Sequence, residues 1–592
     1  MGLIVQKFGG TSVADCQKIL SAARKAIRAQ QEGNQVVMVV SAMGKNTDLL
    51  VDLARQITEQ PAAREMDMLL STGEQVSVAL MAMAIHSLGH KAVSLTGGQI
   101  GIRTDQAHTK ARIKSISTER MRRLLDEGNI VVAAGFQGID EEFDITTLGR
   151  GGSDTTAVAL AAVLRANSCE IYTDVDGVYT TDPRKLAEAR RVSQISYDEM
   201  LELASLGAGV MHNRSIEFAK KFNVPIHVRS SFTDIPGSMI VSEPESREQA
   251  VCGAAVTLDE ARVTIVGVPD VPGTSLDFFS AIADRNITVD MIVQNIGEGG
   301  KADISFTVPR HELGLTLEVI DPVATRLGAT KVTHDENVSK VSVVGLGMAE
   351  QTGVADKMFV ALSEAGINIQ MITTSEIKIS VLVKRDEAQL ALQTLHRAFE
   401  LGIEPVNKST QPVSAGSDAD VADMLAVMRD MDMEDLFIDD ISLDQHQSRV
   451  TIVGVPDTPG VAAKVFQHVA EAGIFVDMIV QSYDGIDGRA SLSFSVPRES
   501  LEQSVKVAEN LAKLFDCRKV TSSPDVAKLS VSGVGLRSHT GVAIRMFRSL
   551  AAAGINVDLI NTSEVQVNVI VDGAQGEKAL AQLNAAFADV LR

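Results

Sequence analysis

The first 235 or so residues alternate two patterns of apolar positions. Apolar residues recur with helical spacing over 13–30, 64–88, 154–166 and 213–222. Between these stretches lie short, continuous apolar runs rich in β-branched residues, at 35–41, 91–95, 129–134, 169–173 and 224–229. Continuous apolar strands that alternate with helices are typical of an α/β layer fold with a mainly parallel sheet. We predict one such catalytic-looking domain over residues 1–245.

After residue 250 the pattern changes to internal repetition. The sequence VTIVGVPDVPG at 263–273 returns as VTIVGVPDTPG at 450–460, a shift of 187 residues (450 less 263). The sequence AGINIQMITTSEIKISVLV at 365–383 returns as AGINVDLINTSEVQVNVIV at 553–571, a shift of 188 residues (553 less 365). Ordered matches at nearly one offset indicate that a whole unit was duplicated.

Each duplicated unit also contains one pattern twice. A strand ends at a glycine, a loop ends in a further glycine, a helix follows, and a second strand begins. This order predicts α+β modules of the βαββαβ type. We place four modules at 255–335, 336–407, 441–523 and 524–592.

A linker at 408–440 separates the two pairs of modules. It is acidic and lacks strand alternation, and it contains a short Met-rich helical pattern at 419–433. We interpret these methionines as packing residues, because Met fills irregular gaps in apolar cores.

Composition narrows the class of protein. A chain of 592 residues is too long for one core, and 45% hydrophobic with 22% charged residues is ordinary for a soluble globular protein. The net charge of −21 and the lack of a Lys/Arg tract with interleaved aromatics disfavour a nucleic-acid surface. The four cysteines lie far apart without a CxxC pair, which disfavours a disulfide framework or a zinc site and fits a reducing compartment.

The sequence also bears on location. No apolar run approaches the roughly 20 residues of a membrane span, and the N-terminus lacks the features of a signal peptide. We therefore expect a cytoplasmic protein without membrane association.

The first predicted strand ends in KFGGTS, a sequence suited to an anion. Gly9 and Gly10 let backbone N–H groups approach a phosphate closely, and Lys7 adds a full positive charge. A tight turn with a solvent-exposed lysine is the alternative.

A second glycine-rich stretch, TTLGRGGSDTTAVALAAVL at 146–164, strengthens the anion-binding interpretation. Arg150 stands among three glycines, and Ser153 and Asp154 begin an apolar helix. A carboxylate or phosphate would bind there through backbone amides and the guanidinium, although Ser153 or Asp154 alone could simply cap the helix. The spacing matches neither a Rossmann fingerprint nor a P-loop.

A third stretch, YTDVDGVYTTDPRKL at 172–186, follows a predicted strand. It carries Thr173, Asp174 and Asp176 at the strand tip, with Tyr179 and Arg184 further along. We interpret it as a loop that lines a nucleotide, while a turn with exposed acids is the alternative.

Together these stretches resemble a known family. KFGGTSV, VVSAMGKNTD, STGEQVS, TTLGRGGSDTTA and YTDVDGVYTTDPR are similar, in this order, to the signatures of the aspartate kinases, members of the amino acid kinase superfamily that carry ACT regulatory domains. The resemblance covers essentially the whole chain. It implies an amino acid kinase-like three-layer fold followed by four ACT-type modules.

The resemblance also implies roles for individual residues. Lys7, Asp154 and Arg150 would be catalytic; Asp154 would organise the catalytic cations without direct ligation of a metal by the protein. The residues implied for ATP and phosphate are Lys7, Gly9, Gly10, Ser41, Thr173, Asp174, Tyr179 and Arg184. The residues implied for the substrate are Thr47, Glu74 for the aspartate amino group, Arg150 for its α-carboxylate, and Ser153.

One position departs from the family pattern. Members often carry a nucleotide-contacting Lys where this chain has Gly209. His212, Arg214 or Lys220 are the candidates to replace it.

The implied reaction transfers a phosphoryl group from ATP to the β-carboxylate of aspartate, with Mg²⁺. A carboxylate is ionised at pH 7, so its attack needs no general base. The protein must hold two anions in line and offset their charge. A covalent aspartyl-enzyme route through Asp154 is the less favoured alternative.

The repeated modules resemble ACT domains, which bind amino acids at their interfaces. The PDVPG and PDTPG segments place a glycine at a helix start, where N–H groups bind a carboxylate. Asp290 with Gln294, and Asp477 with Gln481, would then hold an ammonium or amide group. The full set of predicted effector residues is Asp270, Gly273, Asp290, Gln294, Asn368, Ser375, Asp457, Gly460, Asp477, Gln481, Asn556 and Ser563, although local turns and strand ends would also explain them.

The resemblance implies feedback inhibition by lysine, threonine or both, because aspartate kinase opens the route to these amino acids. We also expect a homodimer through the ACT domains, because exposed edges of their sheets favour symmetric pairing.

Two other readings of the sequence stay open. A kinase of the same superfamily would act on glutamate, acetylglutamate or UMP, but Glu74 with Arg150 suits a free α-amino acid. An amino-acid sensor with an inactive kinase-like domain is the second, and Gly209 is its only support.

Overall fold

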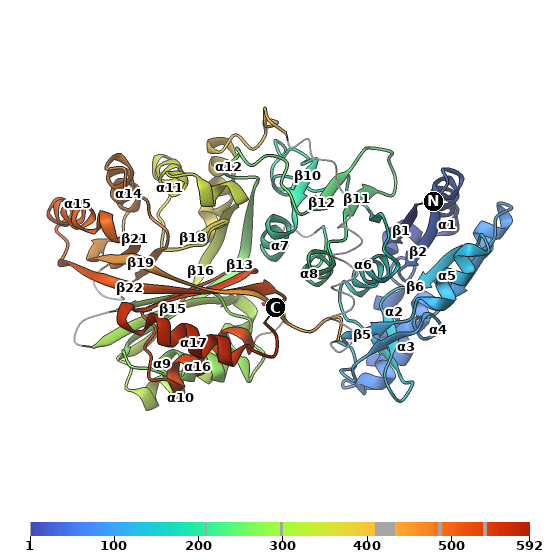
Figure 1. The fold of residues 1–592 in the computed structure, drawn as a ribbon, viewed down its shortest axis with the longest axis horizontal. Coiled ribbons are helices and arrows are strands. Elements are labelled where there is room, and N and C mark those ends of the chain that lie inside the picture. Colours follow the sequence, from blue (N-terminus) through green and yellow to red (C-terminus); the bar gives the residue numbers. More distant parts are fainter. Residues whose placement is uncertain are drawn as a thin grey trace.

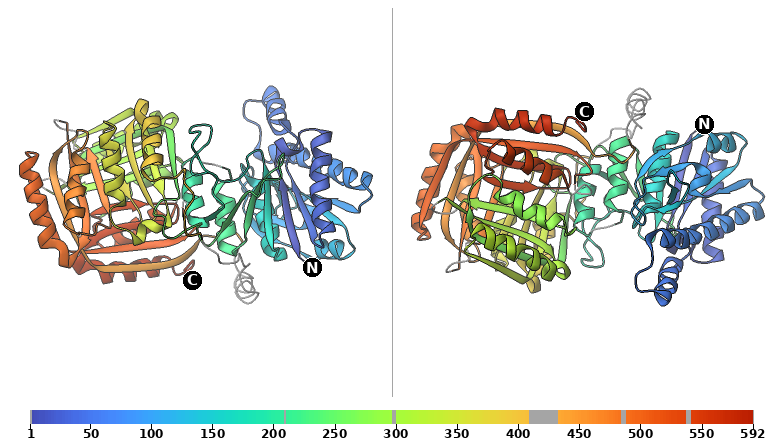
Figure 2. Two further views of the ribbon diagram at one scale, coloured as in Figure 1. Left: turned by 90° about the horizontal axis from the view of Figure 1, so that it is seen from above. Right: turned by 90° about the horizontal axis from the view of Figure 1, so that it is seen from below.

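The structure, a computed structural model, describes residues 2–207, 210–296, 300–408, 432–483, 488–536 and 541–591. The chain forms two large bodies (Figure 1). The N-terminal body, drawn blue to teal, lies on one side. The C-terminal body contains the elements from β13 (Gly253–Pro269) onward, drawn green to red. The views in Figure 2 show that the two bodies meet over a narrow waist.

The N-terminal body is built on an eight-stranded sheet. Seven neighbouring pairs align the strands, and six of them are parallel; only β11 and β12 are antiparallel. The mainly parallel sheet is therefore confirmed. Its strand order is β10 (Gln194–Ser196), β12 (Ser238–Val241), β11 (Ile226–Ser230), β9 (Ser168–Thr173), β1 (Leu3–Phe8), β2 (Gln35–Val40), β6 (Ile130–Ala134) and β3 (Ala92–Leu95).

Helices cover both faces of this sheet and give three layers. On one face α1 (Cys16–Gln31) and α3 (Ala63–Ser87) bury their apolar sides against alternate residues of the strands, such as Met38 and Val132. On the other face the strands present Val39 and Val131. The helices there are α5 (Glu119–Asp126), α6 (Gly152–Leu164), α7 (Tyr197–Ser205) and α8 (Asn213–Phe222).

A small sheet extends this body. Its strand order is β5 (Ile113–Ile116), β4 (Ile102–Thr104), β7 (Gln137–Ile139) and β8 (Ile145–Thr147). The short helices α2 (Asn46–Ile57) and α4 (Gly97–Ile100) complete the body. The β7–β8 hairpin leads directly into α6, and it therefore sets the direction of the loop that carries Arg150.

Helix α3 corrects one expectation from the sequence. Its 25 residues include an 18-residue window with a mean hydropathy of 1.4, so it is long and apolar enough to cross a membrane by length and composition. No run of this length is expected from the sequence. Slightly more than half of the window, 56%, is buried, and the helix contacts α1, β3, β6 and β8. It has the place of a core helix in this fold.

The C-terminal body contains one continuous sheet of twelve strands with helices outside it. The strand order is β14 (Asp290–Ile296), β15 (Lys301–Pro309), β13, β16 (Lys331–Val344), β18 (Lys378–Lys384), β17 (Met371–Thr374), β20 (Ile479–Tyr483), β21 (Arg489–Pro497), β19 (Phe437–Pro456), β22 (Lys519–Val534), β24 (Gln566–Asp572) and β23 (Leu559–Thr562). The helices are α9 (Thr274–Ala283), α10 (Leu313–Leu327), α11 (Val354–Glu364), α12 (Ala388–Ala398), α14 (Val461–Glu471), α15 (Leu501–Leu514), α16 (Gly541–Ala552) and α17 (Gly576–Ala586). The four α+β modules predicted from the repeats are confirmed.

Two long strands are each shared between modules. Residues 253–257 of β13 pair with 340–344 of β16, whereas residues 260–266 pair with 331–338. In the second unit, 437–444 of β19 pair with 528–534 of β22, and 447–453 pair with 519–526. The second module therefore takes a strand from upstream of the first module, and the fourth takes one from upstream of the third. The module boundaries predicted from the sequence are consecutive along the chain, so they do not include these shared strands.

The two duplicated units pack against each other inside one chain. Strand β17 of the second module bonds to β20 of the third, and β14 of the first contacts β23 of the fourth. The helices form one apolar core for modules two and three and another for modules one and four. A further core lies on the opposite face of the sheet and contains equivalent residues of the two units, including Met291 with Met478 and Val293 with Val480.

These contacts bear on the expected homodimer, which stays a prediction. A homodimer is expected from the sequence because exposed edges of the ACT sheets favour pairing with a second copy of the chain. In the described residues, β17 pairs with β20 of the same chain, whereas β14 and β23 form the two ends of the strand order and contact each other.

Most of the predicted linker, including the Met-rich pattern at 419–433 except for its last two residues, lies outside the described residues. Residue 432 onward is described, and β19 begins at Phe437 within the predicted linker.

Candidate active site

The parallel strands bring the predicted loops to one edge of the sheet. Strands β9, β1, β2 and β6 are neighbours that run in the same direction, so their carboxyl ends lie side by side. The Gly9 N–H donates to the Tyr172 carbonyl at 3.4 Å, and the Ser41 N–H donates to the Phe8 carbonyl at 3.1 Å. The ends of β1 and β9, which carry Lys7 and Thr173, and the loop that carries Ser41 are therefore adjacent.

Lys7 and Asp154 meet at this edge. The Lys7 Nζ lies 2.5 Å from Asp154 Oδ1, and the two side chains are only 11% and 13% exposed. Asp154 lies in the first turn of α6, which begins after Gly151. A full positive charge and the positive end of a helix thus converge, as anion binding requires.

Gly10 is required by the close approach of two loops. A Cβ at this position would lie 2.9 Å from the Ala42 carbonyl oxygen. The Gly44 N–H also donates to the Gly10 carbonyl at 3.0 Å. The loops after β1 and β2 therefore touch backbone to backbone beside Lys7.

Glu74 supplies a buried carboxylate to the same edge. It projects from α3, and its Oε1 accepts the Ala42 N–H at 3.1 Å. Its Oε2 is buried and has no hydrogen-bond partner among the described residues. Burial raises the pKa of the Glu74 carboxyl to about 7. An unpartnered buried oxygen is costly, and a cationic ligand would satisfy it.

Arg150 and Ser153 lie at the start of α6. Arg150 is exposed, and it makes no hydrogen bond or ion pair with the part of the chain that the structure describes. Ser153 is buried against Gly135, where a Cβ would lie 2.7 Å from the Ser153 Oγ. Ser41, which follows β2, and Thr47, in the first turn of α2, are both half-buried.

The predicted nucleotide loop is only partly at this edge. Thr173 ends β9, and its hydroxyl donates to Asp174 Oδ1 at 3.2 Å. Tyr179 is half-buried in a bridge with Arg191. Arg184 is 88% exposed and donates to Asp182 through two nitrogens, which lowers the pKa of Asp182. No contact in the described residues brings Tyr179 or Arg184 to Lys7.

The position of the missing lysine, Gly209, lies outside the described residues. Of its three possible replacements, Lys220 pairs with Asp198 at 2.7 Å and Arg214 pairs with Glu434 at 2.6 Å. His212 lines the same cleft as Arg150 and Asp154, and burial lowers its pKa. Arg214 lines this cleft as well, but Glu434 already engages its guanidinium, whereas Lys220 is not among the lining residues.

Phe136 packs against the start of α6, beside the site, and sequence reasoning missed it. It follows β6 with a φ of 69°, a left-handed conformation that is uncommon for an aromatic residue. A Cβ on Gly152 would lie 2.9 Å from the Phe136 ring. Strained backbone conformations are concentrated at functional sites. The local sequence does not indicate the strain at Phe136, because this residue fits the pattern of the end of an apolar strand.

The predicted effector residues form two equivalent clusters between modules. In one, Asn556 donates to Asp270 at 2.8 Å and Gln294 donates to the Val557 carbonyl at 2.7 Å. In the other, Asn368 donates to Asp457 at 2.9 Å and Gln481 donates to the Ile369 carbonyl at 3.0 Å. Gly273 and Gly460 cap the adjoining helices α9 and α14 with φ of 98° and 88°.

The remaining effector candidates lie apart from these clusters. Asp290 pairs with Lys340, and Asp477 pairs with Lys528 at 2.8 Å, so neither joins its expected glutamine. Ser375 and Ser563 occupy the turns before β18 and β24. Asp290 and Ser563 line the cleft that also contains Arg150 and Asp154, whereas Asp477 and Ser375 line a second, equivalent cleft.

Buried polar contacts join the two bodies beside the first cleft. The Lys378 Nζ lies 2.7 Å from Glu202 of α7, and both side chains are buried. Glu202 also accepts the Glu564 N–H at 2.9 Å, and Asn213 at the start of α8 donates to Glu564 at 3.0 Å. The turn that carries Ser563 is therefore anchored on the body that carries the site.

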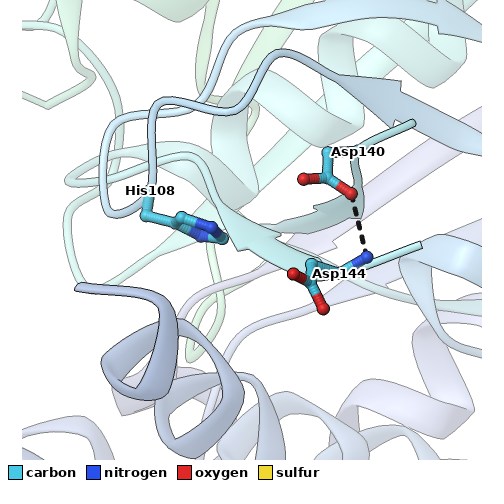
Figure 3. Close-up of side chains that lie close together, drawn as sticks. All are labelled: His108, Asp140 and Asp144. Carbon is cyan, nitrogen blue, oxygen red and sulfur yellow. Dashed lines mark hydrogen bonds between the residues drawn. The ribbon is translucent and has the colours of Figure 1, made fainter. Parts of the chain in front are cut away.

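His108, Asp140 and Asp144 form a cluster elsewhere on the N-terminal body (Figure 3). Their ligand atoms lie within 4.8 Å of one another. Each group already has a protein partner. His108 pairs with Asp67 at 2.8 Å, Asp144 pairs with Arg64, and Asp140 accepts the N–H groups of residues 142 and 144. These contacts stabilise the β7–β8 hairpin, and we interpret the cluster as structural.

Family models match most of the described chain. Residues 2–230 match the amino acid kinase family. Residues 262–323, 341–399, 450–510 and 529–587 match ACT domains.

An aspartate kinase of Stutzerimonas stutzeri is 52% identical over 403 residues, which are 68% of this chain and 98% of the relative. A crystal structure of aspartate kinase from Synechocystis is 40% identical, with a TM-score of 0.51, and covers 99% of this chain and 98% of its own.

Two structures of Escherichia coli aspartokinase III are 25% identical to this chain and cover 67% of it and 99% of their own chains. One, with a TM-score of 0.57, contains aspartate and ADP. The other, with a TM-score of 0.54, contains lysine and aspartate.

Proposed function

The chain belongs to the aspartate kinase family, and from this premise we propose that it transfers the γ-phosphoryl group of ATP to the β-carboxylate of L-aspartate. The product is 4-phospho-L-aspartate, and the reaction is the first step towards lysine, threonine and methionine. Among the described residues, Glu74 Oε2 and the Arg150 guanidinium have no hydrogen-bond partner, and their place at the edge that carries Lys7 supports this substrate most directly. Together they match the ammonium and α-carboxylate of a free amino acid.

Lys7 would receive the transferring phosphoryl group. Its ammonium offsets the charge of the nucleotide phosphates, and Gly9 and Gly10 offer backbone N–H groups beside it. In the described structure Asp154 holds the Lys7 ammonium at 2.5 Å, so the cation is already fixed in place. Catalysis then consists of holding two anions in line, and no residue needs to remove a proton from the aspartate β-carboxyl.

Mg²⁺ is the expected partner of ATP at this site. When bound, it would neutralise charge on the nucleotide phosphates. Asp154 fits such an ion because it is a carboxylate at the phosphate end of the site, and Mg²⁺ prefers carboxylate and phosphate oxygens while keeping several waters. Asp154 would therefore orient the ion through its water shell.

Ser41 follows β2 and Thr173 ends β9, on either side of β1, and both would contact the nucleotide with Asp174, Tyr179 and Arg184. Arg184 would have to leave Asp182 to do so. Thr47 and Ser153 would contact aspartate beside Glu74 and Arg150.

The ACT modules would bind the amino acids that end the pathway. The clusters around Asp270 with Gln294 and Asp457 with Gln481 offer carboxylates and amides at helix starts, which suits lysine or threonine. The clefts around Asp290 and Asp477 are further candidates. An effector inhibits only through unequal affinity for two states, typically by about 1–3 kcal/mol of coupling.

Two wider expectations stay predictions. The protein would be cytoplasmic. The protein would also form a homodimer through its ACT domains, using surfaces other than the edge of β17 that pairs with β20.

Trapping with hydroxylamine tests the reaction, because acyl phosphates form hydroxamates. We expect ATP-dependent hydroxamate with aspartate and none with glutamate or acetylglutamate. Absence of product with aspartate, in a folded protein that binds ATP, would instead favour the inactive sensor.

A further inference from the structure

The last part of the linker docks on the N-terminal body. We call residues 432–436, which lead into β19, the strap. The Met433 N–H donates to the Lys114 carbonyl at 3.0 Å, and its side chain is buried in the core that covers the main sheet. Lys221 of α8, itself buried, donates to the carbonyls of Met433 at 3.0 Å and Asp435 at 2.9 Å. The strap is thus held on both sides, by the small sheet and by α8.

Glu434 is the centre of these contacts. Its side chain is 8% exposed, and both carboxylate oxygens accept from Arg214 of α8, at 2.8 Å from Nε and 2.9 Å from Nη2. The Glu434 Oε1 also accepts the Ile113 N–H at 3.1 Å. A fork of this kind fixes the plane of the guanidinium as well as its position.

Arg214 passes this constraint to the active site. Its Nη1 donates to the Leu148 carbonyl at 2.5 Å, and its Nη2 donates to the Ala111 carbonyl at 2.6 Å. Leu148 directly precedes the Gly149–Arg150–Gly151 turn. On the other side of the turn, a Cβ on Gly151 would lie 2.4 Å from His212, two residues before Arg214. The turn that presents Arg150 is therefore held by the start of α8.

Charge balance makes Glu434 essential to this arrangement. The Arg214 side chain is only 16% exposed, so its guanidinium needs a counter-charge within the protein. Without Glu434, two neutral carbonyls would remain as its protein acceptors among the contacts described above. The poorly paired Arg214 guanidinium would then compete with Arg150 for the substrate carboxylate, or it would move and shift the Leu148 carbonyl.

We propose that Glu434 is a positioning residue for the aspartate-binding turn, acting through Arg214 on the Leu148 carbonyl. This inference rests on the proposed function, in which Arg150 binds the aspartate α-carboxylate. It also gives the second pair of modules a direct mechanical connection to the site, because the strap continues into β19.

This connection would be specific to chains with a duplicated regulatory region. The Stutzerimonas relative leaves 189 residues of this chain unmatched (592 less 403), close to the 187-residue repeat, while 98% of its own length is matched. It is too short to contain the N-terminal body and all four modules, so the site would have to hold this turn without a strap that leads into a second pair.

Steady-state kinetics of full-length Glu434→Gln test the proposal, with hydroxamate as product. Glutamine keeps the size of the side chain but removes the charge and one acceptor. We expect KM for aspartate to rise about tenfold while KM for ATP stays within twofold, since Lys7 and Thr173 do not contact the strap. The milder Glu434→Asp should give an intermediate KM and covers the case in which Glu434→Gln does not fold.

Glu245→Gln is the matched control. Glu245 is 5% exposed and pairs with Arg190 at 3.0 Å, and it touches neither α8 nor the Arg150 turn. It should lower the melting temperature as Glu434→Gln does, without a selective rise in KM for aspartate. An unchanged aspartate KM in both Glu434 variants, or the same selective rise in Glu245→Gln, would overturn the proposal. Lack of turnover in the wild-type protein would instead contradict the proposed function.

Discussion

Glu74 shows at the residue scale how burial prepares a side chain for a ligand. Its pKa of about 7 in the fold compares with an ordinary value of 4.5. Between these pH values the folded protein binds more protons than the unfolded chain, so this group makes the protein less stable as pH rises from about 4.5 to about 7. Aspartate would bring an ammonium group that favours the charged form of Glu74.

We therefore expect KM for aspartate to fall as pH rises through about 7 in the wild-type protein. Glu74→Gln should lose this dependence and raise KM at least about tenfold at pH 8. The variant should also be more stable than the wild type at pH 8 without aspartate, by up to about 3 kcal/mol. Urea unfolding at pH 5 and pH 8 measures the second effect. If the difference in unfolding free energy between Glu74→Gln and the wild type is the same at pH 5 and at pH 8, the raised pKa of Glu74 is contradicted.

Lys7 is the second residue with a sharp expectation. Lys7→Ala removes the charge that offsets the transferring phosphoryl group, so kcat should fall about 10²–10³-fold or more. Asp154→Asn should also abolish most turnover, because the carboxylate that fixes Lys7 is lost. Circular dichroism should show both variants folded. Wild-type turnover in both folded variants would refute this site.

Lys7 and Asp154 could each be identified from the sequence as candidate site residues, but the contact between their side chains could not. Glycines beside a lysine, and an acid at a helix start, are local signals that survive in any fold. That Lys7 and Asp154 touch depends on the register of β1 against β9 and on the path from β8 into α6, which no local pattern contains. The places of Phe136 and Glu434 beside the site could not be predicted, because Phe136 fits the pattern of a strand and Glu434 lies in the predicted acidic linker.

At the scale of elements, the shared strands β13 and β19 are the main departure from the sequence analysis. Periodicity identified the parallel sheet and the four modules, because each element carries its own apolar pattern. It did not identify which strands pair, because residues 253–257 look like any half-buried strand. Register is set by packing across the module, and Val256 and Val341 meet in the same core only in the folded chain.

A pair of fragments tests this exchange. Residues 250–408 should fold, because they contain both partners of the shared strand, whereas residues 336–408 should stay largely unfolded. Val256→Asp should prevent folding of the longer fragment, because it places a charge in the core of the second module. Proton NMR dispersion and circular dichroism measure the outcome. A folded 336–408 fragment would show that the upstream strand is dispensable.

At the scale of the whole molecule, the two units form a pseudo-symmetric assembly with two equivalent effector clusters. Gln294 and Gln481 make the same contact across their interfaces, to Val557 and Ile369 respectively. The surroundings are not equivalent, because the N-terminal body is anchored beside the cleft that contains Ser563 and Glu564, while the equivalent cleft at Ser375 and Asp477 is lined by the C-terminal body alone.

Calorimetric titration with threonine and with lysine can count these sites. Gln294→Ala and Gln481→Ala should each remove one binding site per chain for the amino acid that occupies the clusters, and the double variant should remove both. Inhibition should weaken in each single variant. If neither amino acid binds or inhibits the wild-type protein, the effector assignment fails. Unchanged stoichiometry in the double variant would place the effectors elsewhere.

Pairing of β17 with β20 inside a single polypeptide also has a consequence for how the enzyme responds in the cell. When such an interface joins two separate molecules, its occupancy falls on dilution; a covalent connection replaces that dependence with a fixed local concentration. The two pairs of ACT modules would therefore stay assembled at low expression. Each pair could also acquire its own ligand preference, because a substitution in one pair is not repeated in the other.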